Sequence, residues 1–597
     1  MIEERLQALR TAMEKKNIDI YIIPTSDFHE SEYVGDYFKS RRFMTGFTGS
    51  AGTAVITKDI AGLWTDGRYF IQAERQLKDS PVTLFKSGED GVPTVKAFVD
   101  EKLPQNGCIG FDGRVINGKS GEEYKEIADK KEGTLYVDED LVAPIWKDRP
   151  DLPANPVYIL EESYAGESAA DKLKRVRETM EKEKASMHII TSLYDIAWLL
   201  NIRGDDIPHV PVVLSYVVIT KTECLWFVQE ECLNEQVQTY IKTNGITVLP
   251  YDEIYQYVNQ LKKEEAVLID KNVVNYRIYQ SLGEKAELIQ KENPTELMRA
   301  LKNETELKNI KEAHIKDGVA FTKFMYWVKK QVKAGLGLTE VEASDYLEER
   351  RKEQEHFVDI SFDTICAYQE NGAMMHYSAT QDNCAVLKPE GFLLVDSGGH
   401  YLEGSTDITR TLALGPLTEK QKLHFTAVCR SNLRLSAAKF LHGCTGNNLD
   451  ILARGPLWDM GLDYKCGTGH GIGYLLNVHE GPNGFRWKIV PERNDSCVLE
   501  EGMVTTNEPG VYLEGEYGIR TENELICRKA EKNEYGQFMY FETVTYAPID
   551  LDAIIPEKME ESERVLLNDY HKMVYDKISP FLNEEEKDWL VEYTREI

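Results

Sequence analysis

The chain has 597 residues, of which 42% are hydrophobic, and a formal net charge of −30. This length predicts three or four domains with buried cores, and the acidic balance excludes the basic surface that nucleic-acid binding needs. The first residues, MIEERLQALRTAMEKK, lack the apolar core of a signal peptide, and the longest apolar stretch, near 211–219, is too short to cross a bilayer. Ten cysteines are scattered without a CxxC pair. We therefore expect a cytoplasmic protein with reduced thiols and no membrane partner.

The N-terminal half contains an internal repeat. Residues 6–26 (LQALRTAMEKKNIDIYIIPTS) and 173–192 (LKRVRETMEKEKASMHIITS) each have the pattern of a helix followed by a buried strand. Four prolines within 143–156 indicate an extended linker between the copies. We predict two α/β domains of the same type, residues 1–154 and 155–302, related by duplication.

A third domain is predicted for residues 303–545, and its two halves share one order of elements. Two capping boxes start its first two helices: Asn303 with Glu306, and Thr339 with Glu342. Strands follow through DISFDTICAYQ and GFLLVDSGG, and the order helix, helix, strands recurs from Thr418 onwards. Because ligand sites favour the seam between two halves, we expect the active site there.

The remaining residues, 546–597, form an acidic tail. Its apolar residues have helical spacing: Leu566, Leu567, Tyr570, Met573, Val574 and Ile578. Two interpretations fit this pattern. The helix packs on its own domain, or it presents a dimerisation face to a second copy of the chain.

Four carboxylates and one histidine lie in short segments rich in Gly, Thr and β-formers, where a strand meets a tight turn. They are Asp396 in VDSGG, Asp407 in STDITRT, His470 in GTGHGIG, Glu508 in TNEPGVY and Glu522 in RTENE. Burying four carboxylates together is too costly without cations. Two divalent ions would cancel the charge and could hold a bridging hydroxide as the nucleophile. Ligation by oxygen atoms with one imidazole favours Mn²⁺, whereas structural zinc sites use mostly Cys and His.

These motifs, together with GFTGSAGTAVIT and LWTDGRYF near the start, resemble those of aminopeptidase P, the Xaa-Pro aminopeptidases among the pita-bread metallopeptidases. The resemblance covers nearly the whole chain, and the series of five motifs is specific where a single motif is weak. It implies an α/β (α+β) fold with two creatinase-like N-terminal domains followed by a pita-bread catalytic domain. It also implies a cytosolic three-domain member whose C-terminal extension serves in a homodimer. The family's metal ligands, in chain order, map onto Asp396, Asp407, His470, Glu508 and Glu522.

The resemblance also assigns roles in catalysis. Glu508 is expected to serve as the proton shuttle as well as a ligand. His376 in MMHYS and His479 in NVHEGP are expected to face the substrate and stabilise the developing oxyanion. Arg520 is expected to order the acidic cluster. Arg68 in WTDGRY would reach the substrate cleft, although an arginine in a solvated turn is the alternative.

Two residues near the proposed ligands, Glu524 and Cys466, need an interpretation of their own. Glu524 lies two residues after Glu522 and would point the same way on a strand, but TENE aligns better with Glu522 as the ligand. Cys466, in KCGTGH, stands where family members often carry a histidine. The thiol is smaller and a weaker donor, so we expect it either to fill space or to make the pocket for the group after the scissile bond more apolar.

The sequence therefore predicts a metal-dependent aminopeptidase that cleaves the first bond of peptides with proline in second place. A prolidase-type dipeptidase with the same ligands is the alternative, which the duplicated N-terminal domains and the length disfavour. A non-catalytic pita-bread binding protein is disfavoured because all five ligands are present, and creatinase shares the fold but not the ligands.

Overall fold

The computed structural model describes residues 2–490 and 493–597. The chain folds into two compact units, an N-terminal unit of residues 1–161 with 167–295 and a C-terminal unit of residues 162–166 with 296–597. No helix in the described ranges combines the length and the apolar composition that a bilayer crossing requires.

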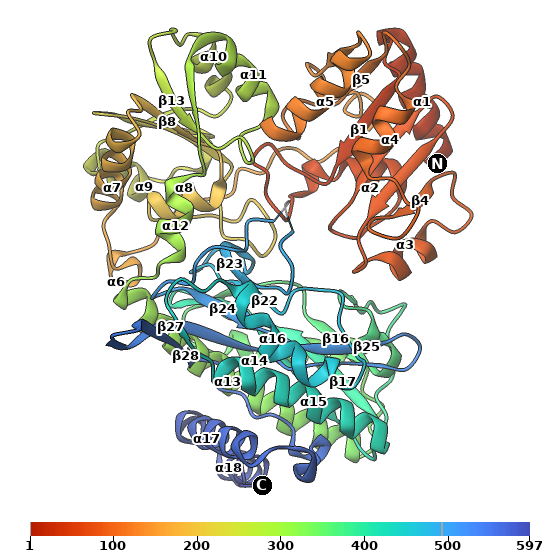
Figure 1. Ribbon diagram of the computed structural model, residues 1–597, viewed down its shortest axis with the longest axis vertical. Helices are drawn as coiled ribbons and strands as arrows, with labels where there is room; N and C mark the ends of the chain where they lie inside the picture. The colour runs from red at the N-terminus through yellow and green to blue at the C-terminus, as the bar shows by residue number, and fades with distance from the viewer. Residues whose placement is uncertain (1, 491–492) are drawn as a thin grey trace. The chain divides into compact units, whose positions relative to one another are not determined.

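The N-terminal unit contains two six-stranded sheets with one topology (Figure 1). The first has the order β4 (Thr83–Lys86), β3 (Ala61–Thr65), β2 (Thr53–Thr57), β1 (Ile20–Pro24), β5 (Cys108–Gly110), β6 (Thr134–Tyr136). The second has the order β12 (Ile246–Pro250), β11 (Cys224–Val228), β10 (Ser215–Thr220), β8 (Met187–Ile190), β13 (Ala266–Ile269), β14 (Glu287–Gln290). The central pair is antiparallel in both sheets, and both outer pairs are parallel. The strand order thus repeats as the sequence repeat predicted.

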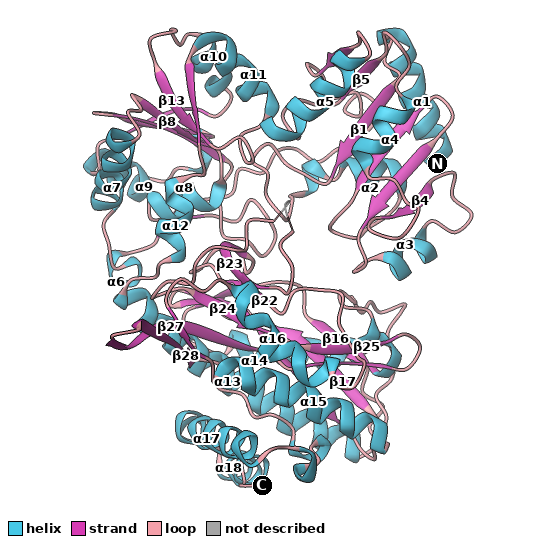
Figure 2. Ribbon diagram, viewed as in Figure 1, coloured by secondary structure: helices cyan, strands magenta, loops and turns pink. Residues whose placement is uncertain are grey.

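Helices pack beside both sheets (Figure 2). Helices α1 (Ile2–Lys16) and α7 (Ala169–Lys182) precede the central strands β1 and β8, as the repeat indicated. The boundary predicted between residues 154 and 155 stays a prediction, because both sheets belong to one compact unit.

Equivalent helices of the two repeats meet at their N-termini. Asn117 caps α5 (Gly118–Lys130) and Asn275 caps α11 (Tyr276–Lys285), and these two asparagines pair as a β-bridge. Next to this bridge, the backbone N–H of Tyr276 donates to the carbonyl of Ile116 at 2.7 Å. The pairing of backbone groups explains why the two repeats form one unit, because each buried amide needs a partner.

The C-terminal unit starts with α13 (Glu304–Lys333) and α14 (Glu340–Lys352), and both predicted capping boxes are confirmed. Three-stranded sheets follow: β15 (Phe357–Ile360) with β18 (Gly399–Tyr401) and β19 (Gly404–Ser405), and β16 (Ile365–Tyr368) with β17 (Phe392–Ser397) and β20 (Ile408–Ala413). The predicted order helix, helix, strands is thus present in the first half.

The second half repeats this order. Helix α15 (Glu419–Ser436) starts at the capping box of Thr418, and α16 (Gly446–Trp458) follows. A six-stranded sheet then has the order β21 (Lys439–Leu441), β28 (Gly536–Thr543), β27 (Asn523–Asn533), β24 (Val504–Asn507), β22 (Gly469–Gly471), β23 (Glu480–Phe485). A separate two-stranded hairpin of β25 (Gly510–Leu513) and β26 (Tyr517–Arg520) completes the second half. The fold is the predicted one.

The C-terminal tail packs on its own unit. Helix α17 (Glu561–Ile578) contacts α13 and α15, and α18 (Glu584–Tyr593) contacts α13 (Figure 1). Leu567, Tyr570, Val574 and Ile578 are buried in one core cluster with side chains of α15. Of the two interpretations of the tail, packing on its own domain is confirmed. These four side chains are buried within one protomer, and a dimerisation role for the tail stays a prediction.

We expect Leu567→Ala to lower the free energy of unfolding by about 3 kcal/mol, because the fully buried side chain would leave a cavity. Denaturant unfolding of the purified variant measures this. Val565→Ala is the matched control on the same helix, since Val565 is 51% exposed and its loss should cost little. Equal stability losses in the two variants would contradict the packing described here.

Candidate metal centre

Two neighbouring strands of the first half carry the two aspartates. Asp396 lies in β17 and pairs in register with Thr409 of β20. Asp407 immediately precedes β20, two residues before Thr409 and therefore on the same face of the strand as Thr409. The antiparallel pair thus brings the two carboxylates to one face.

The second half supplies His470 from β22. Its Nε2 atom lies 3.6 Å from Asp407 Oδ2 and 3.4 Å from Glu508 Oε1. Its Nδ1 atom lies 3.0 Å from the carbonyl oxygen of Gly471. A neutral ring with its proton on Nδ1 donates to that carbonyl and leaves the Nε2 lone pair facing the carboxylates, the arrangement of a metal ligand.

The glycine before His470 is required by the packing of the strands. A Cβ atom at Gly469 would lie 1.8 Å from the carbonyl oxygen of Thr506 in β24. The threonine hydroxyl also accepts a hydrogen bond from the backbone N–H of His470 at 3.0 Å. The close approach of β22 to β24 therefore fixes His470 beside Glu508, which directly follows β24.

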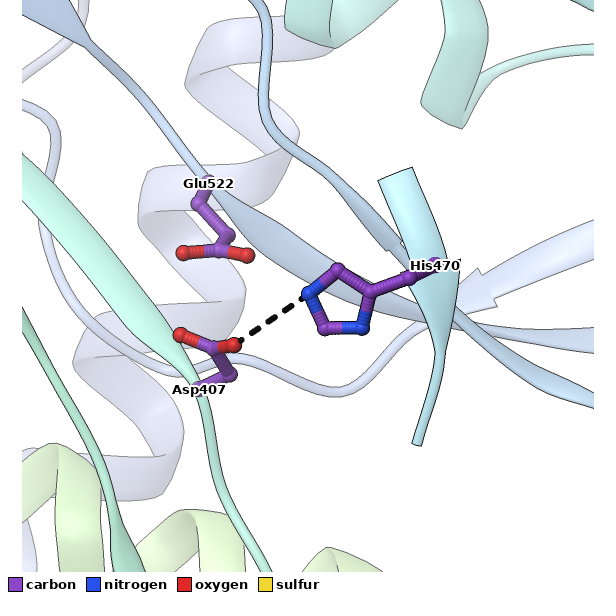
Figure 3. Close-up of side chains that lie close together, drawn as sticks. All are labelled: Asp407, His470 and Glu522. Carbon is purple, nitrogen blue, oxygen red and sulfur yellow. Dashed lines mark ion pairs between the residues drawn. The ribbon is translucent and has the colours of Figure 1, made fainter. Parts of the chain in front are cut away.

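Glu522 completes the cluster from the short connection between β26 and β27. Thr409 donates its hydroxyl to Glu522 Oε2 at 2.7 Å, and the backbone N–H of Glu522 donates to the carbonyl of Thr409 at 3.1 Å. Ligand atoms of Asp407, His470 and Glu522 all lie within 4.8 Å of one another (Figure 3). Side chains from both halves of the unit thus converge on one point.

The carboxylates of the cluster are buried close to one another, and their negative charges repel. Burial, followed by the charges of Glu522 and Asp396, raises the pKa of Asp407 well above its ordinary value. Burial, followed by the charges of Glu508 and Asp396, does the same for the pKa of Glu522. The pKa of Glu508 is raised to about 6, mainly by burial. The negative charges of Asp396, Glu508 and Glu522 therefore contribute to the raised pKa values in the cluster.

The donor set fits divalent cations. Asp396 Oδ1 and Asp407 Oδ1 are buried and accept no hydrogen bond from the residues that the structure describes. A buried carboxylate oxygen without a donor is unfavourable unless a cation faces it. Carboxylate oxygens with one imidazole nitrogen are ligands that hard or borderline divalent ions accept.

Arg520 lies buried at the end of β26 and contacts the cluster as predicted. Its Nη2 atom forms an ion pair with Asp396, Nη1 donates to the Tyr512 hydroxyl at 2.7 Å, and Nε donates to Thr409 Oγ1 at 3.2 Å. The guanidinium therefore fixes the orientation of Asp396, and its charge lowers the pKa values of Glu508 and Glu522 against the effect of burial.

Glu524 is occupied elsewhere, which supports the choice of Glu522. Its Oε1 atom accepts the backbone N–H of Asp407 at 2.8 Å, and its Oε2 atom lies 3.0 Å from Nε2 of His314. His314 is a fully buried residue of α13 that sequence reasoning missed. A histidine between apolar positions of a helix was the signal available, and it gave no indication of a partner more than two hundred residues away in the sequence.

The two histidines expected to face the substrate are placed differently with respect to the cluster. The His479 ring is half-buried and lies 4.3 Å from the His470 ring at 86°. His376 is half-buried in the turn after the η3 segment (Gln369–Ala373). This segment packs against β26, where a Cβ atom at Gly518 would lie 1.7 Å from the carbonyl oxygen of Gly372. The His479 ring therefore lies beside one residue of the cluster, His470. A catalytic role for His376 stays a prediction.

Arg68 belongs to the N-terminal unit, in the turn after β3. Its Nε and Nη2 atoms each donate to the carboxylate of Asp66 at 2.8 Å. This bidentate pair holds the guanidinium in the turn. A role for Arg68 in substrate binding stays a prediction.

Cys466 is partly buried beside the core cluster that also holds Tyr464. Burial, followed by the negative charge of Glu508, raises the pKa of its thiol to about 11. The thiol is therefore uncharged near neutral pH.

We expect Cys466→Ala to keep kcat within about threefold of the unchanged protein, with any loss mainly in KM, because a neutral space-filling group contributes equally to ground-state and transition-state binding. Steady-state kinetics between pH 6 and 9 would measure this. A fall in kcat of about a thousandfold would instead give the thiol a chemical role.

Comparison with known proteins agrees with this architecture. Models of the Creatinase/Prolidase N-terminal domain match residues 5–138 and 148–306. The model of metallopeptidase family M24 matches residues 308–529, and that of the C-terminal region of peptidase M24 matches 537–597.

Relatives match this chain over nearly its whole length. A probable Xaa-Pro aminopeptidase P of Laccaria bicolor is 37% identical, over 98% of this chain and 92% of its own. Aminopeptidase P2 of Arabidopsis thaliana is 37% identical, over 100% of this chain and 88% of its own. The crystal structure of an X-prolyl aminopeptidase from Caenorhabditis elegans, described as a cytosolic enzyme with a di-nuclear active site, superposes with a TM-score of 0.94 at 31% identity and full coverage of both chains.

Proposed function

This chain belongs to the aminopeptidase P family of M24 metallopeptidases, and from that premise we propose that it releases the N-terminal residue from peptides with proline in second place. The observation that carries the proposal is the convergence of Asp407, His470 and Glu522 within 4.8 Å, next to buried carboxylate oxygens that lack donors. The family resemblance and the fold class predicted from the sequence are confirmed.

Two divalent metal ions fit this site, and the di-nuclear site of the Caenorhabditis elegans relative supports that number. We propose five residues as their ligands: Asp396, Asp407, His470, Glu508 and Glu522. The oxygen-rich donor set favours Mn²⁺. When bound, the ions supply Lewis acidity and activate the water that attacks the peptide carbonyl.

The remaining chemistry is assigned to side chains of the site. The Xaa-Pro amide nitrogen carries no hydrogen and must receive a proton before it leaves. Glu508 is proposed to take a proton from the attacking water and deliver it to this nitrogen. His479 and His376 are proposed to donate hydrogen bonds to the carbonyl oxygen as its negative charge develops. Arg520 keeps Asp396 oriented, and the proposed place for Arg68 is at the substrate.

The competing assignment is a prolidase-type dipeptidase. Xaa-Pro dipeptides assayed beside longer Xaa-Pro peptides, with and without Mn²⁺, separate the two. We expect metal-dependent release of the first residue from the longer peptides. Cleavage confined to dipeptides would overturn the aminopeptidase assignment, and no cleavage of either substrate under any metal loading would favour a non-catalytic binding protein.

We propose a cytoplasmic location, which the cytosolic relative from Caenorhabditis elegans supports, and a homodimer. Because the apolar stripe of the tail packs on its own unit, we propose another surface for the dimer. Trp458, Trp487 and Ile489 are 41%, 49% and 68% exposed, and the two indole rings meet edge to face at 6.1 Å. An exposed apolar cluster of this kind marks an interaction surface.

We expect Trp487→Asp to convert the dimer to a monomer in sedimentation velocity, because a charge in a buried apolar interface is strongly unfavourable. Tyr535→Asp is the matched control, since Tyr535 is 75% exposed on the turn between β27 and β28. A dimer that withstands Trp487→Asp would place the interface elsewhere.

A further inference from the structure

A buried cluster of charged side chains lies directly behind His479. Glu480 accepts hydrogen bonds from Lys302 Nζ at Oε1 and from Arg299 Nη1 at Oε2. All three side chains are at least 94% buried. Arg299 lies in α12 (Pro294–Ala300) and Lys302 just after it, in the segment that leads into α13. One carboxylate is thus held from two sides by two cations.

The backbone of Glu480 is paired to that of the metal centre. Glu480 is the first residue of β23 and pairs with Gly471 of β22, at the point where the register between these strands shifts after His470. His479 immediately precedes it, and the His479 ring meets the His470 ring edge to face at 4.3 Å. Whatever fixes Glu480 therefore fixes the backbone from which the His479 ring extends.

The loop that carries His479 closes tightly around this carboxylate. A Cβ atom at Gly473 would lie 3.2 Å from Glu480 Oε2. Asn477 donates its Nδ2–H to the carbonyl of His479 at 2.7 Å, and the backbone N–H of Gly473 donates to the carbonyl of Asn477 at 3.1 Å. The chain on either side of His479 has little freedom while Glu480 keeps its two partners.

A gain in folding stability does not explain why the charged side chains of Glu480, Arg299 and Lys302 are buried together behind His479. Well-packed apolar residues of similar volume would serve a core equally well or better, because taking charges out of water offsets most of their attraction. A carboxylate between two fixed cations, by contrast, has one favourable position, which is what a site needs when a side chain must be held to a fraction of an ångström.

We propose that Glu480, held by Lys302 and Arg299, is a positioning residue that keeps the His479 ring against His470 and directed at the reacting carbonyl. This inference rests on the proposed function, because it assumes that His479 contacts the substrate. Glu480 itself does not touch the reacting atoms.

A double-mutant cycle tests the proposal on the Mn²⁺-loaded full chain with an Xaa-Pro tripeptide. The four proteins are the unchanged chain, His479→Ala, Glu480→Gln and the double variant. We expect Glu480→Gln to lower kcat by about tenfold to a hundredfold, with a smaller change in KM and unchanged metal content. In the His479→Ala background, the same substitution should cost no further activity.

Glu563→Gln is the matched control. Glu563 is also buried and also held by two cations, Arg430 and Arg434, but it lies in α17 and contacts neither histidine. Its replacement should lower the melting temperature and leave kcat unchanged. Comparison of the two variants therefore distinguishes a loss of positioning, which lowers kcat, from a loss of stability, which lowers only the melting temperature.

Two outcomes contradict different statements. Equal losses from Glu480→Gln in the presence and absence of the His479 side chain would overturn the positioning role and leave the proposed function intact. Full kcat in His479→Ala would overturn the proposed role of His479, and the positioning role with it.

A second pair of variants applies if Glu480→Gln does not fold. Lys302→Met should lower kcat without further loss in the His479→Ala background, and Lys302→Arg, which keeps the ion pair, should restore it. A Lys302→Arg variant as slow as Lys302→Met would also contradict the proposal.

Discussion

Asp407→Asn is expected to lower kcat by at least about a thousandfold, because it removes a charged ligand from the point where Asp407, His470 and Glu522 converge. Elemental analysis of the purified protein should find two divalent ions per unchanged chain and fewer in the variant. The fold should persist, since the hydrogen bond from residue 407 to Glu524 uses the backbone N–H, which asparagine keeps.

The same variant makes a prediction about stability without metal. Replacing one of four mutually repelling carboxylates should leave the melting temperature of the metal-free protein unchanged or higher. Asp588→Asn, at an exposed position of α18, is the control that should keep both activity and metal content. Full activity in the metal-stripped unchanged protein would refute the dinuclear assignment.

Metal removal is expected to destabilise the protein more as the pH rises. Burial and neighbouring charges raise the pKa values of Asp407 and Glu522 in the folded, metal-free protein. A carboxyl whose folded pKa exceeds its unfolded pKa contributes stability below the unfolded pKa, near 4, and this contribution is lost as the pH rises through the raised folded pKa. The metal-free protein should therefore lose stability between pH 5 and pH 8.

Metal binding stabilises the folded protein more as the pH rises, because the ligands must be deprotonated to coordinate the ions. At about a hundredfold excess of metal over its dissociation constant, binding adds about 2.7 kcal/mol, which corresponds to roughly 2 to 4 °C in the melting temperature of a protein of this size. We expect the difference in melting temperature between metal-loaded and metal-free protein to widen from pH 5.5 to pH 8. A difference that narrows over this range would contradict the electrostatics described for the site.

Several features could be predicted from the sequence because their causes are local. The capping boxes at Asn303, Thr339 and Thr418 each depend on residues three positions apart, and all three form. The helix and strand patterns of the two N-terminal repeats depend on spacing within a short segment, and both sheets have the same strand order. The five motifs of the site are also local, and Gly or Pro directly flanks two of the candidate ligands, His470 and Glu508.

Other features depended on contacts between distant segments. The apolar stripe of the tail fitted an interchain face as well as an internal one, and only the tertiary structure shows that α17 packs on α13 and α15. Likewise, period-2 alternation placed Glu522 and Glu524 on one face of a strand, whereas the structure turns Glu524 to His314 and to the backbone of Asp407.

The sequence by itself determined the fold class and the order of the domains, and it supplied the proposed ligands of the metal centre, because each was encoded by residue types at short, fixed spacings. Only the tertiary structure decided which charged groups support that centre. Glu480 meets Arg299 and Lys302 across more than 170 residues of chain, and Glu524 meets His314 across more than 200. Such pairs leave no periodic pattern, because burial and distance in space, not spacing in the chain, set their energies.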